Sequence, residues 1–525
     1  MLPASCSARK RWSEIQLTSQ FLPPSFVELD DTMAIMQCDW PNGVAHGAPR
    51  MNANDSAIAQ AERAPVLAAP IPPQGKVSLV EYVRLIRDSS IAAFGQEAYE
   101  LDIIERKIFG RPRFIVNDPA AVKHVLLDNV ANYEKTEIAR RILEPGLGKG
   151  LLTSEGETWK MHRRTMTPAF DQRSVSAYTS VMTGAAEELM EKWDNAGHAS
   201  TIDVSMAMTE VTLQIISRTM FSSDSDDMAA IMERSFGEYQ AQMRPNLLDL
   251  IGMPAWLAGL GRMNVAKRTL REFNVVIDRL IATRTRNPES SPKDLLGRLI
   301  AARDEQTGIR MTAQEVRDNI MTIFMAGHET TAMTMTWTWY LLSQHPAVEA
   351  KLHAELDAVL AGRLPNYEDL SRLPYSRMII DESMRMYPPA HTIVRVALAE
   401  DTLCGRPIPK GAIIIISPWL LHRHTKQWQD PGRFIPERFD TENSAHRPRF
   451  SYLPFGGGRR ICIGAAFALA EATILLATIA SRYRLTLAPG HRVEPRALIT
   501  LRARHGMKMQ AARRSSAARH QLRTA

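Results

Sequence analysis

The sequence predicts a mainly α-helical protein with small β-sheets, an α+β architecture. Apolar residues recur with helical spacing from about residue 120 to Ser376, whereas strand-like segments are confined to residues 114–116, 411–417 and 484–487. With 525 residues, of which 45% are hydrophobic and 23% charged, the composition is that of a soluble globular protein with a substantial core. The helical periodicity therefore decides the fold class.

Three regions are expected along the chain. Residues 1–75 lack sustained periodicity and end in the Pro-rich stretch APVLAAPIPPQG, which predicts a disordered N-terminal extension. Residues 76–510 form the main domain, and residues 511–525 form a basic C-terminal tail. The net charge is +7, and from Pro495 onward there are eight Lys or Arg and no acid, which leaves 7 − 8 = −1 for the rest. The basicity is thus expected in a solvated terminus and does not indicate a nucleic-acid partner.

The four cysteines indicate no disulfide framework, because they form no paired spacing. The sequence also contains no run of eighteen or more apolar residues and no apolar signal core near its start. We therefore expect no membrane span and a cytoplasmic location.

The first helix is expected to begin near Val77, in SLVEYVRLIRDSS. A short strand over residues 114–116, a turn over residues 117–119 and another helix follow it. The longest helix is predicted from Ala313 to His345, because Thr312 and Glu315 form a capping box and Pro346 stops it. It is apolar on nearly all sides, so it should cross the centre of the domain.

The stretch AGHETT interrupts this apolar helix with polar groups. Gly327 leaves room beside the backbone, and the Thr330 hydroxyl can bond to the carbonyl of Ala326. Glu329 is costly in a buried helix unless it has a partner or a use. The stretch therefore predicts a groove lined by a hydroxyl and a carboxyl group, with a buried polar pair between helices as the alternative.

Two further motifs concern arginines. Glu382 and Arg385 are one helical turn apart and, together with Arg438 of FIPERF, can form a carboxylate held between two guanidinium groups, which is a structural lock. Trp159 and Arg163 are four residues apart on one face of a short helix, where an indole N–H and a guanidinium can together bind an anion.

The stretch FGGGRRICIG is the most specific signal. It places Cys462 between Gly458 and Gly464, with Phe455 before it and Arg460 beside it. Glycines allow the backbone to approach a flat group closely, and the arginine can meet its anions.

Together, in order and spacing, these motifs resemble those of the cytochrome P-450 superfamily of haem-thiolate monooxygenases, in particular its soluble bacterial-type members. The cysteine loop matches the pattern Phe-x-x-Gly-x-Arg-x-Cys-x-Gly, and the resemblance covers residues 76–510 as the catalytic domain. It implies the cytochrome P-450 fold, with haem between the long central helix and the cysteine loop with the helix that follows it.

The resemblance also implies a cofactor, haem b (iron protoporphyrin IX), with Cys462 as the axial thiolate ligand of its iron. Further residues implied to contact the haem are Phe455, Gly458, Arg460, Gly464, Trp159, Arg163, Arg395, Ala326 and Gly327. Thr330 and Glu329 are the implied catalytic residues, which would handle the protons needed to cleave O₂.

The substrate is expected to be a lipophilic small molecule, either a terpenoid or a fatty-acyl compound. Its expected pocket is lined by Phe324, Ile393, Val394 and Leu498 and by a loop over residues 138–151, with residues 243–263 as a lid. The chain ends 63 residues (525 − 462) after Cys462, too few for a fused reductase. Electrons from NAD(P)H are therefore expected through a ferredoxin or flavodoxin-type donor with its reductase, docking near Arg459 on a monomer.

Three alternatives remain open. An isomerase or dehydratase of the same fold would need no external electrons, and a haem-thiolate sensor or binding protein would not turn over. The pair Glu329 and Thr330 argues against both. A nucleic-acid-binding role lacks any supporting motif.

Overall fold

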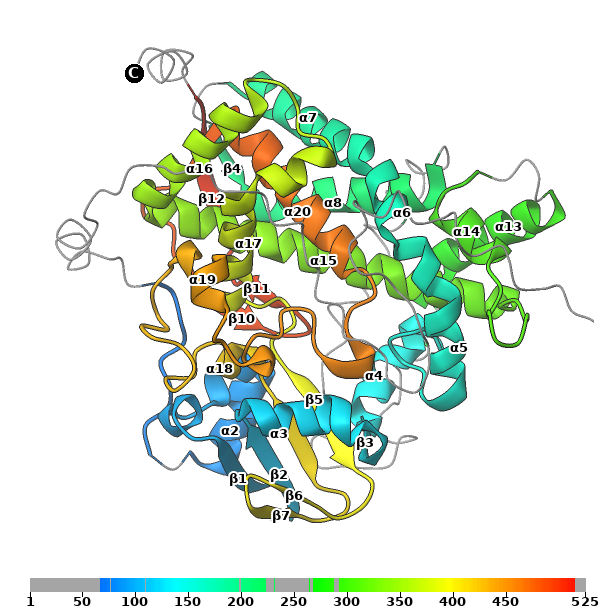
Figure 1. Cartoon of the computed structure of the whole chain (residues 1–525), viewed down its shortest axis with the longest axis vertical. Helices are drawn as coiled ribbons and strands as arrows, with labels where there is room; N and C mark the ends of the chain where they lie inside the picture. The colour runs from blue at the N-terminus through cyan, green and yellow to red at the C-terminus, as the bar shows by residue number, and fades with distance from the viewer. Residues whose placement is uncertain are drawn as a thin grey trace, which may run out of the picture. The chain divides into compact units, whose positions relative to one another are not determined.

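A computed structural model describes residues 67–222, 268–287 and 292–514, except residues 76, 109, 198 and 199, and also residues 231 and 264. All of them belong to one unit of the chain, residues 55–525. The architecture is mainly helical with small sheets, which confirms the predicted fold class (Figure 1).

The long central helix is α15 (Ala313–Gln344), which has 32 residues and begins with the predicted capping box of Thr312 and Glu315. It packs against α8 (Val204–Phe221), α17 (Pro374–Met386) and α20 (Ala465–Ala480). Because neighbours cover it on several sides, almost every residue from Val316 onward is buried, as the apolar sequence predicts.

The other helices surround this centre or cover the sheets. Ser78 caps α2 through the Glu81 N–H at 3.2 Å, and Asp118 caps α3 through the Ala121 N–H at 2.8 Å, so both predicted starts are confirmed. A π-helical turn (His124–Asp128) continues α3. The helices are α2 (Leu79–Asp88), α3 (Pro119–Lys123), α4 (Glu137–Leu147), α5 (Gly156–Met166), α6 (Gln172–Ala177), α7 (Thr179–Asn195), α13 (Arg271–Arg286), α14 (Leu295–Ala301), α16 (Pro346–Leu360), α18 (Pro418–Leu421) and α19 (Thr441–Ser444).

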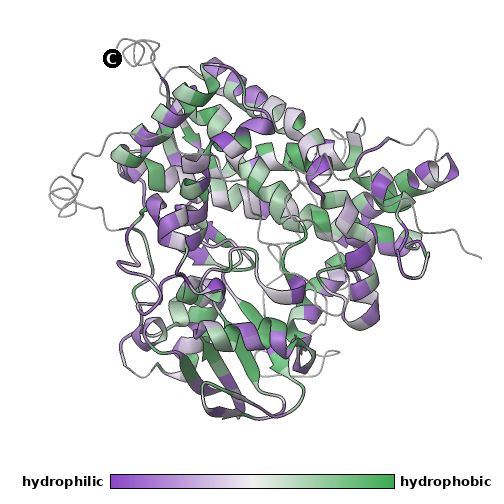
Figure 2. Ribbon diagram, in the orientation of Figure 1, coloured by the Kyte–Doolittle hydropathy of each residue, from purple (hydrophilic) through white to green (hydrophobic). Residues whose placement is uncertain are grey.

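The largest sheet has five strands in the order β1-β2-β8-β5-β3. Only β2 and β8 run parallel among its neighbouring pairs. Figure 2 shows hydrophobic residues along several of these strands, and β8 has no exposed residue on either face. The pairing of β3 with β5 brings together two basic side chains discussed below. The strands are β1 (Ile103–Ile108), β2 (Arg111–Val116), β3 (Tyr133–Lys135), β5 (Ile393–Ala397) and β8 (Ile413–Ile416).

Three smaller sheets complete the described part of the fold. A three-stranded sheet has the order β4-β12-β9, and the pairs β6-β7 and β10-β11 are antiparallel hairpins. Their bounds are β4 (Ser200–Asp203), β6 (Asp401–Leu403), β7 (Arg406–Ile408), β9 (Tyr483–Leu487), β10 (Pro495–Ala497), β11 (Leu501–Ala503) and β12 (Lys508–Arg513).

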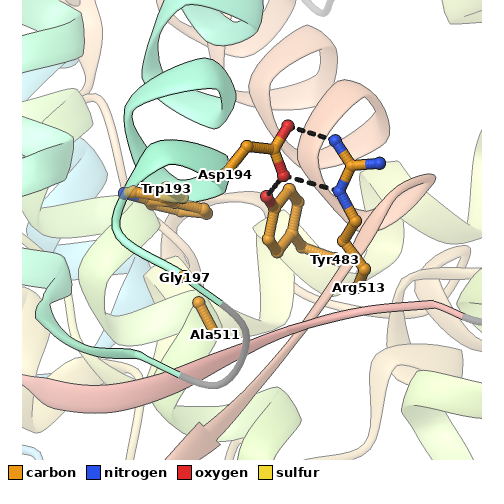
Figure 3. A pocket seen from close by; sticks show the side chains of 6 residues that line it. All are labelled: Trp193, Asp194, Gly197, Tyr483, Ala511 and Arg513. Atoms are coloured by element: carbon orange, nitrogen blue, oxygen red, sulfur yellow. Dashed lines mark hydrogen bonds and ion pairs between the residues drawn. The ribbon is translucent and has the colours of Figure 1, made fainter.

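The basic C-terminal region is ordered as far as residue 514, so the prediction of a solvated terminus from Pro495 onward is wrong there. Strand β12 includes the first residues of the predicted tail, and its Arg513 forms an ion pair with Asp194 at the end of α7 (Figure 3). The Tyr483 hydroxyl donates to the same carboxylate. Arg514 binds Asp357 at 2.7 Å. Acids of the main domain therefore neutralise arginines that the sequence pattern assigned to solvent.

The described end of the predicted N-terminal extension contacts the helical core. The Ala68 N–H donates to the Tyr340 hydroxyl at 3.2 Å, and the Tyr387 hydroxyl donates to the Ala68 carbonyl at 2.8 Å. For the rest of residues 1–75, an extension outside the main domain stays a prediction.

Two other predictions concern the pocket. Residues 138–151, expected as a loop, are mostly helical, because α4 spans Glu137–Leu147 with Thr136 as its N-cap. The expected lid at residues 243–263 lies outside the described residues. None of the described helices combines the length and apolar character needed to span a bilayer.

Candidate active site

The cysteine loop, residues 454–464, leads directly into α20. The Cys462 N–H donates to the Phe455 carbonyl at 2.9 Å, which closes the loop. Gly456 and Gly458 have φ of 74° and 67°. A Cβ on Gly458 would lie 1.8 Å from the carbonyl oxygen of Leu126, so only glycine fits there. The protein itself therefore requires this glycine, through the π-helical turn that packs behind the loop.

Cys462 combines an exposed side chain with a desolvated thiol. Its side chain is exposed, yet surrounding protein atoms raise the pKa of the thiol by burial, while the Gly464 N–H and the Arg163 guanidinium lower it. A thiol on the outer surface would not be desolvated in this way. The sulfur has a backbone N–H and a cation beside it, which stabilise a thiolate ligand.

Helix α5 presents Trp159 and Arg163 to this loop. Arg163 Nη1 donates to the Ile461 carbonyl at 2.8 Å, and the guanidinium of Arg460 lies 4.3 Å from the centre of the Trp159 ring. The predicted anion clamp is therefore divided: Arg163 binds the loop backbone, whereas Trp159 supports Arg460 by a cation–π contact.

Lys135, Arg395 and Arg460 form what we call the cationic cluster. Lys135 on β3 lies directly opposite Arg395 on β5, and like charges in that position destabilise a sheet. Among the described residues, Glu155 is the one carboxylate that forms an ion pair with the cluster, 3.8 Å from Lys135 Nζ and in contact with Arg460. Desolvation, and then Arg460, lower the pKa of Lys135 to about 7. The cluster therefore has positive charge in excess.

The excess of positive charge is clearest at Arg395. Within the described part of the chain, its guanidinium makes one hydrogen bond, from Nη1 to the Val394 carbonyl at 3.0 Å, although a guanidinium has five N–H donors. Desolvation, and then repulsion by Arg460, lower its pKa to about 10. Two carboxylates would supply the missing acceptors, so these residues fit the propionates of the haem predicted from the sequence. Lys135 was not predicted, since its only signal is its pairing opposite Arg395.

The AGHETT stretch divides between two sides of α15. Ala326 is exposed and Thr330 half-buried in an otherwise buried helix, and they share a face because they are one turn apart. The Thr330 hydroxyl donates to the Ala326 carbonyl at 2.8 Å, as predicted. A Cβ on Gly327 would lie 3.4 Å from Ile216, so this glycine faces α8.

Glu329 does not line the same face, which corrects the expected groove. It is 5% exposed, and its Oε1 accepts hydrogen bonds from the Arg502 guanidinium and the Thr500 hydroxyl. Its neighbour His328 is also buried, with Nδ1 donating to the Phe324 carbonyl at 2.7 Å. Sequence spacing placed the carboxyl and hydroxyl groups together, whereas consecutive helix residues point about 100° apart.

The expected substrate contacts also separate. Ile393 reaches the cysteine loop, since a Cβ on Gly456 would lie 3.9 Å from its Cδ1. Val394 follows it on β5 and points to the opposite face, and Leu498 lies half-buried in the β10–β11 turn. Phe324 is fully buried and stacks on Phe221, so it belongs to the core.

Glu382, Arg385 and Arg438 form the predicted structural lock. Arg385 Nε lies 2.6 Å from Glu382, and Arg438 Nε lies 3.4 Å from the same carboxylate. Arg385 also donates to the carbonyls of residues 422, 431 and 433 at 2.8–2.9 Å. The lock ties the irregular segment before the cysteine loop to α17.

Comparisons with known proteins agree with these motifs. The family described as cytochrome P450 matches residues 92–504. Cyclooctatin synthase of Streptomyces melanosporofaciens is 36% identical over 411 residues, covering 77% of this chain and 87% of that protein. Pentalenene oxygenase of Streptomyces avermitilis is 31% identical over 419 residues, covering 79% and 89%. The crystal structure of the cytochrome P450DA heme domain has a TM-score of 0.74 and 26% identity, covering 86% of this chain and 99% of that one.

Proposed function

Because the chain belongs to the cytochrome P450 family and is a cytochrome P450 monooxygenase, we propose that it inserts one oxygen atom of O₂ into a lipophilic terpenoid. Relatives named cyclooctatin synthase, cyclooctat-9-en-7-ol 5-monooxygenase and pentalenene oxygenase support this substrate class. A fatty-acyl substrate has no comparable support among these relatives.

The observation that carries the proposal is the position of Cys462, an exposed cysteine that is desolvated inside the protein. We propose that its thiolate is the axial ligand of haem b, with the Gly464 N–H and Arg163 stabilising the negative sulfur. A haem held there would supply the O₂-activating chemistry. Arg395, Arg460 and Lys135 would bind the two propionates and so lose their mutual repulsion.

Thr330 and Glu329 would manage protons from different positions. The Thr330 hydroxyl uses its hydrogen on the Ala326 carbonyl, so its oxygen can accept a hydrogen bond from a water on the exposed face of α15. The carboxylate of Glu329 would transfer protons from behind that face. Thr330 thus orients the proton donor, and Glu329 replenishes it.

The substrate would lie against the apolar side chains of Ile393 and Leu498 and beside Ala326, whose small side chain leaves space on α15. Apolar walls exclude water and select a lipophilic molecule mainly by shape. Electrons would pass from NAD(P)H through a reductase and a ferredoxin or flavodoxin-type donor. Arg459, one residue before Arg460 in the cysteine loop, would contribute to that docking surface. A monomeric state and a cytoplasmic location stay predictions.

The test is oxygen transfer under ¹⁸O₂ with a ferredoxin, its reductase and NADPH. The probes are the terpene hydrocarbon pentalenene and palmitic acid, analysed by mass spectrometry. We expect one ¹⁸O atom in a terpenoid product and none in the acid. Labelled palmitic acid with unlabelled pentalenene would contradict the substrate class, and a rearranged product without ¹⁸O would favour the isomerase alternative.

A further inference from the structure

The carboxylate of Glu329 is held by a hairpin that is distant in sequence. Arg502 Nε donates to Glu329 Oε1 at 2.7 Å, and Arg502 Nη2 and the Thr500 hydroxyl donate to the same oxygen. Arg502 lies on β11 and Thr500 directly before it. Both Glu329 and Thr500 are buried, with 5% and 6% exposure. One oxygen of the acid therefore accepts three hydrogen bonds from Thr500 and Arg502, which lie two positions apart in the same hairpin.

The hairpin that supplies these donors is itself fixed. Trp337 Nε1 donates to the Leu501 carbonyl at 2.9 Å, and the Leu501 N–H donates to the Pro389 carbonyl at 3.1 Å. His391 Nε2 donates to the Leu498 carbonyl at 3.0 Å, which places the proton on that nitrogen. Three bonds on both sides of Thr500 therefore set the direction from which Arg502 reaches the acid.

This arrangement has consequences for the chemistry of Glu329. A buried carboxylate needs a counter-charge, and the Arg502 guanidinium supplies it. The three bonds at Oε1 fix the position of that oxygen. The carboxylate is therefore paired with a cation and held in place.

We propose that Arg502 and Thr500 are positioning residues for proton delivery, which hold the Glu329 carboxylate in a fixed position behind the Thr330 face of α15. This inference rests on the proposed proton role of Glu329. Neither residue touches the reacting atoms in this account. Proton transfer thus depends on a hairpin whose turn also carries Leu498, a proposed substrate contact.

The experiment compares Arg502→Gln, Arg502→Lys, Thr500→Val and Glu329→Gln in the haem-containing enzyme. Three quantities are measured: hydrogen peroxide released per NADPH, the solvent deuterium isotope effect on product formation, and the infrared carboxylate band that Glu329→Gln removes from the resting protein. Arg504→Gln is the matched control, because Arg504 lies directly after the same strand but binds Asp88 at 3.0 Å and Glu494 at 2.7 Å.

We expect Arg502→Gln to lower coupled product formation about tenfold, with more peroxide and a larger isotope effect, since loss of a general acid–base group typically costs at least that much. The infrared carboxylate band of Glu329 should shift, because the acid loses its counter-charge and two of its three donors. Arg502→Lys should recover most of the coupling and Thr500→Val should lose about half. In the Glu329→Gln background, Arg502→Gln should add nothing.

Two results would overturn the inference, and they are distinguishable. If Glu329→Gln alters all three quantities and Arg502→Gln alters only thermal stability, the hairpin is a structural tie. If Glu329→Gln alters neither peroxide yield nor the isotope effect, the proposed proton role of Glu329 fails and the positioning role fails with it. Arg502→Lys and Thr500→Val keep the test available if Arg502→Gln does not fold.

Discussion

Two groups of largely buried basic residues in this protein differ in how their N–H donors find acceptors. In the structural lock, Arg385 uses its guanidinium on Glu382 and on three backbone carbonyls, so all five of its N–H donors have acceptors. In the cationic cluster, Arg395 makes one hydrogen bond among the described residues and faces Lys135 across the sheet. The first group is complete within the protein, whereas the second requires anions from outside it.

This difference separates a structural motif from a binding site better than burial does. Glu382 and Arg385 are 0% exposed, and Lys135 and Arg460 are only 14% and 15% exposed, so both groups are mostly desolvated. The number of donors without acceptors distinguishes them. Substitutions should therefore affect folding in the first group and ligand retention in the second.

The largest effect is expected at Glu382. Glu382→Gln keeps the side-chain shape but leaves the fully buried Arg385 without its counter-charge, which should lower the free energy of unfolding by about 3–5 kcal/mol. Urea unfolding of the purified variant measures this. Arg438→Gln is the matched control and should cost about 1 kcal/mol, because Arg438 lies farther from the carboxylate, at 3.4 Å. Equal losses in both variants would contradict the distinction.

Glu471 on α20 shows a third way to accommodate a buried ionisable group, because this acid is kept neutral. It is 2% exposed, and desolvation raises its pKa to about 8, opposed by a hydrogen bond with Thr331. Between its ordinary pKa and about 8, the unfolded chain loses a proton that the folded protein keeps, so this group makes stability fall as pH rises.

Glu471→Gln should remove that dependence. Wild-type stability should therefore decline relative to the variant by about 1.4 kcal/mol per pH unit between pH 6 and pH 7.5. Urea unfolding at several pH values measures the difference. A constant difference over this range would show that the acid is ionised in the folded protein.

A smaller effect is expected at Lys135, and its sign should depend on haem. Without haem, Lys135→Met removes a repulsive charge and should leave stability unchanged or slightly higher. With haem, it removes a charged propionate contact and should speed haem loss about tenfold. Transfer of haem to apomyoglobin measures the rate. Unchanged retention of haem would remove Lys135 from the site.

The sequence predicts more of the fold than of the site. The central helix with its capping box, the two helix starts near the N-terminus and the lock of Glu382 follow from local rules, so they are present as expected. Lys135 could not be identified, because its role arises from a pairing between strands more than 250 residues apart (395 − 135 = 260). The ion pairs of Arg502 and Arg513 could not be predicted for the same reason, and the sequence analysis therefore assigned the C-terminal arginines to solvent.

Glu329 illustrates the limit of motif reading. The AGHETT motif predicts a groove lined by the Glu329 carboxyl and the Thr330 hydroxyl. The partner that holds Glu329 instead comes from β11, and nothing in the spacing of AGHETT indicates that strand. Phe324 likewise has the residue type of a pocket wall but packs against Phe221 in the core.

The most direct test of the central claim is the carbon monoxide difference spectrum of the reduced protein beside its Cys462→Ser variant. Cys404→Ser is the control, because Cys404 is the other exposed cysteine among the described residues. The account predicts the strongly red-shifted Soret band of thiolate-ligated haem in the wild type and the control, and its loss in Cys462→Ser. A band that survives in Cys462→Ser, or one at the position of histidine-ligated haem in the wild type, would contradict it.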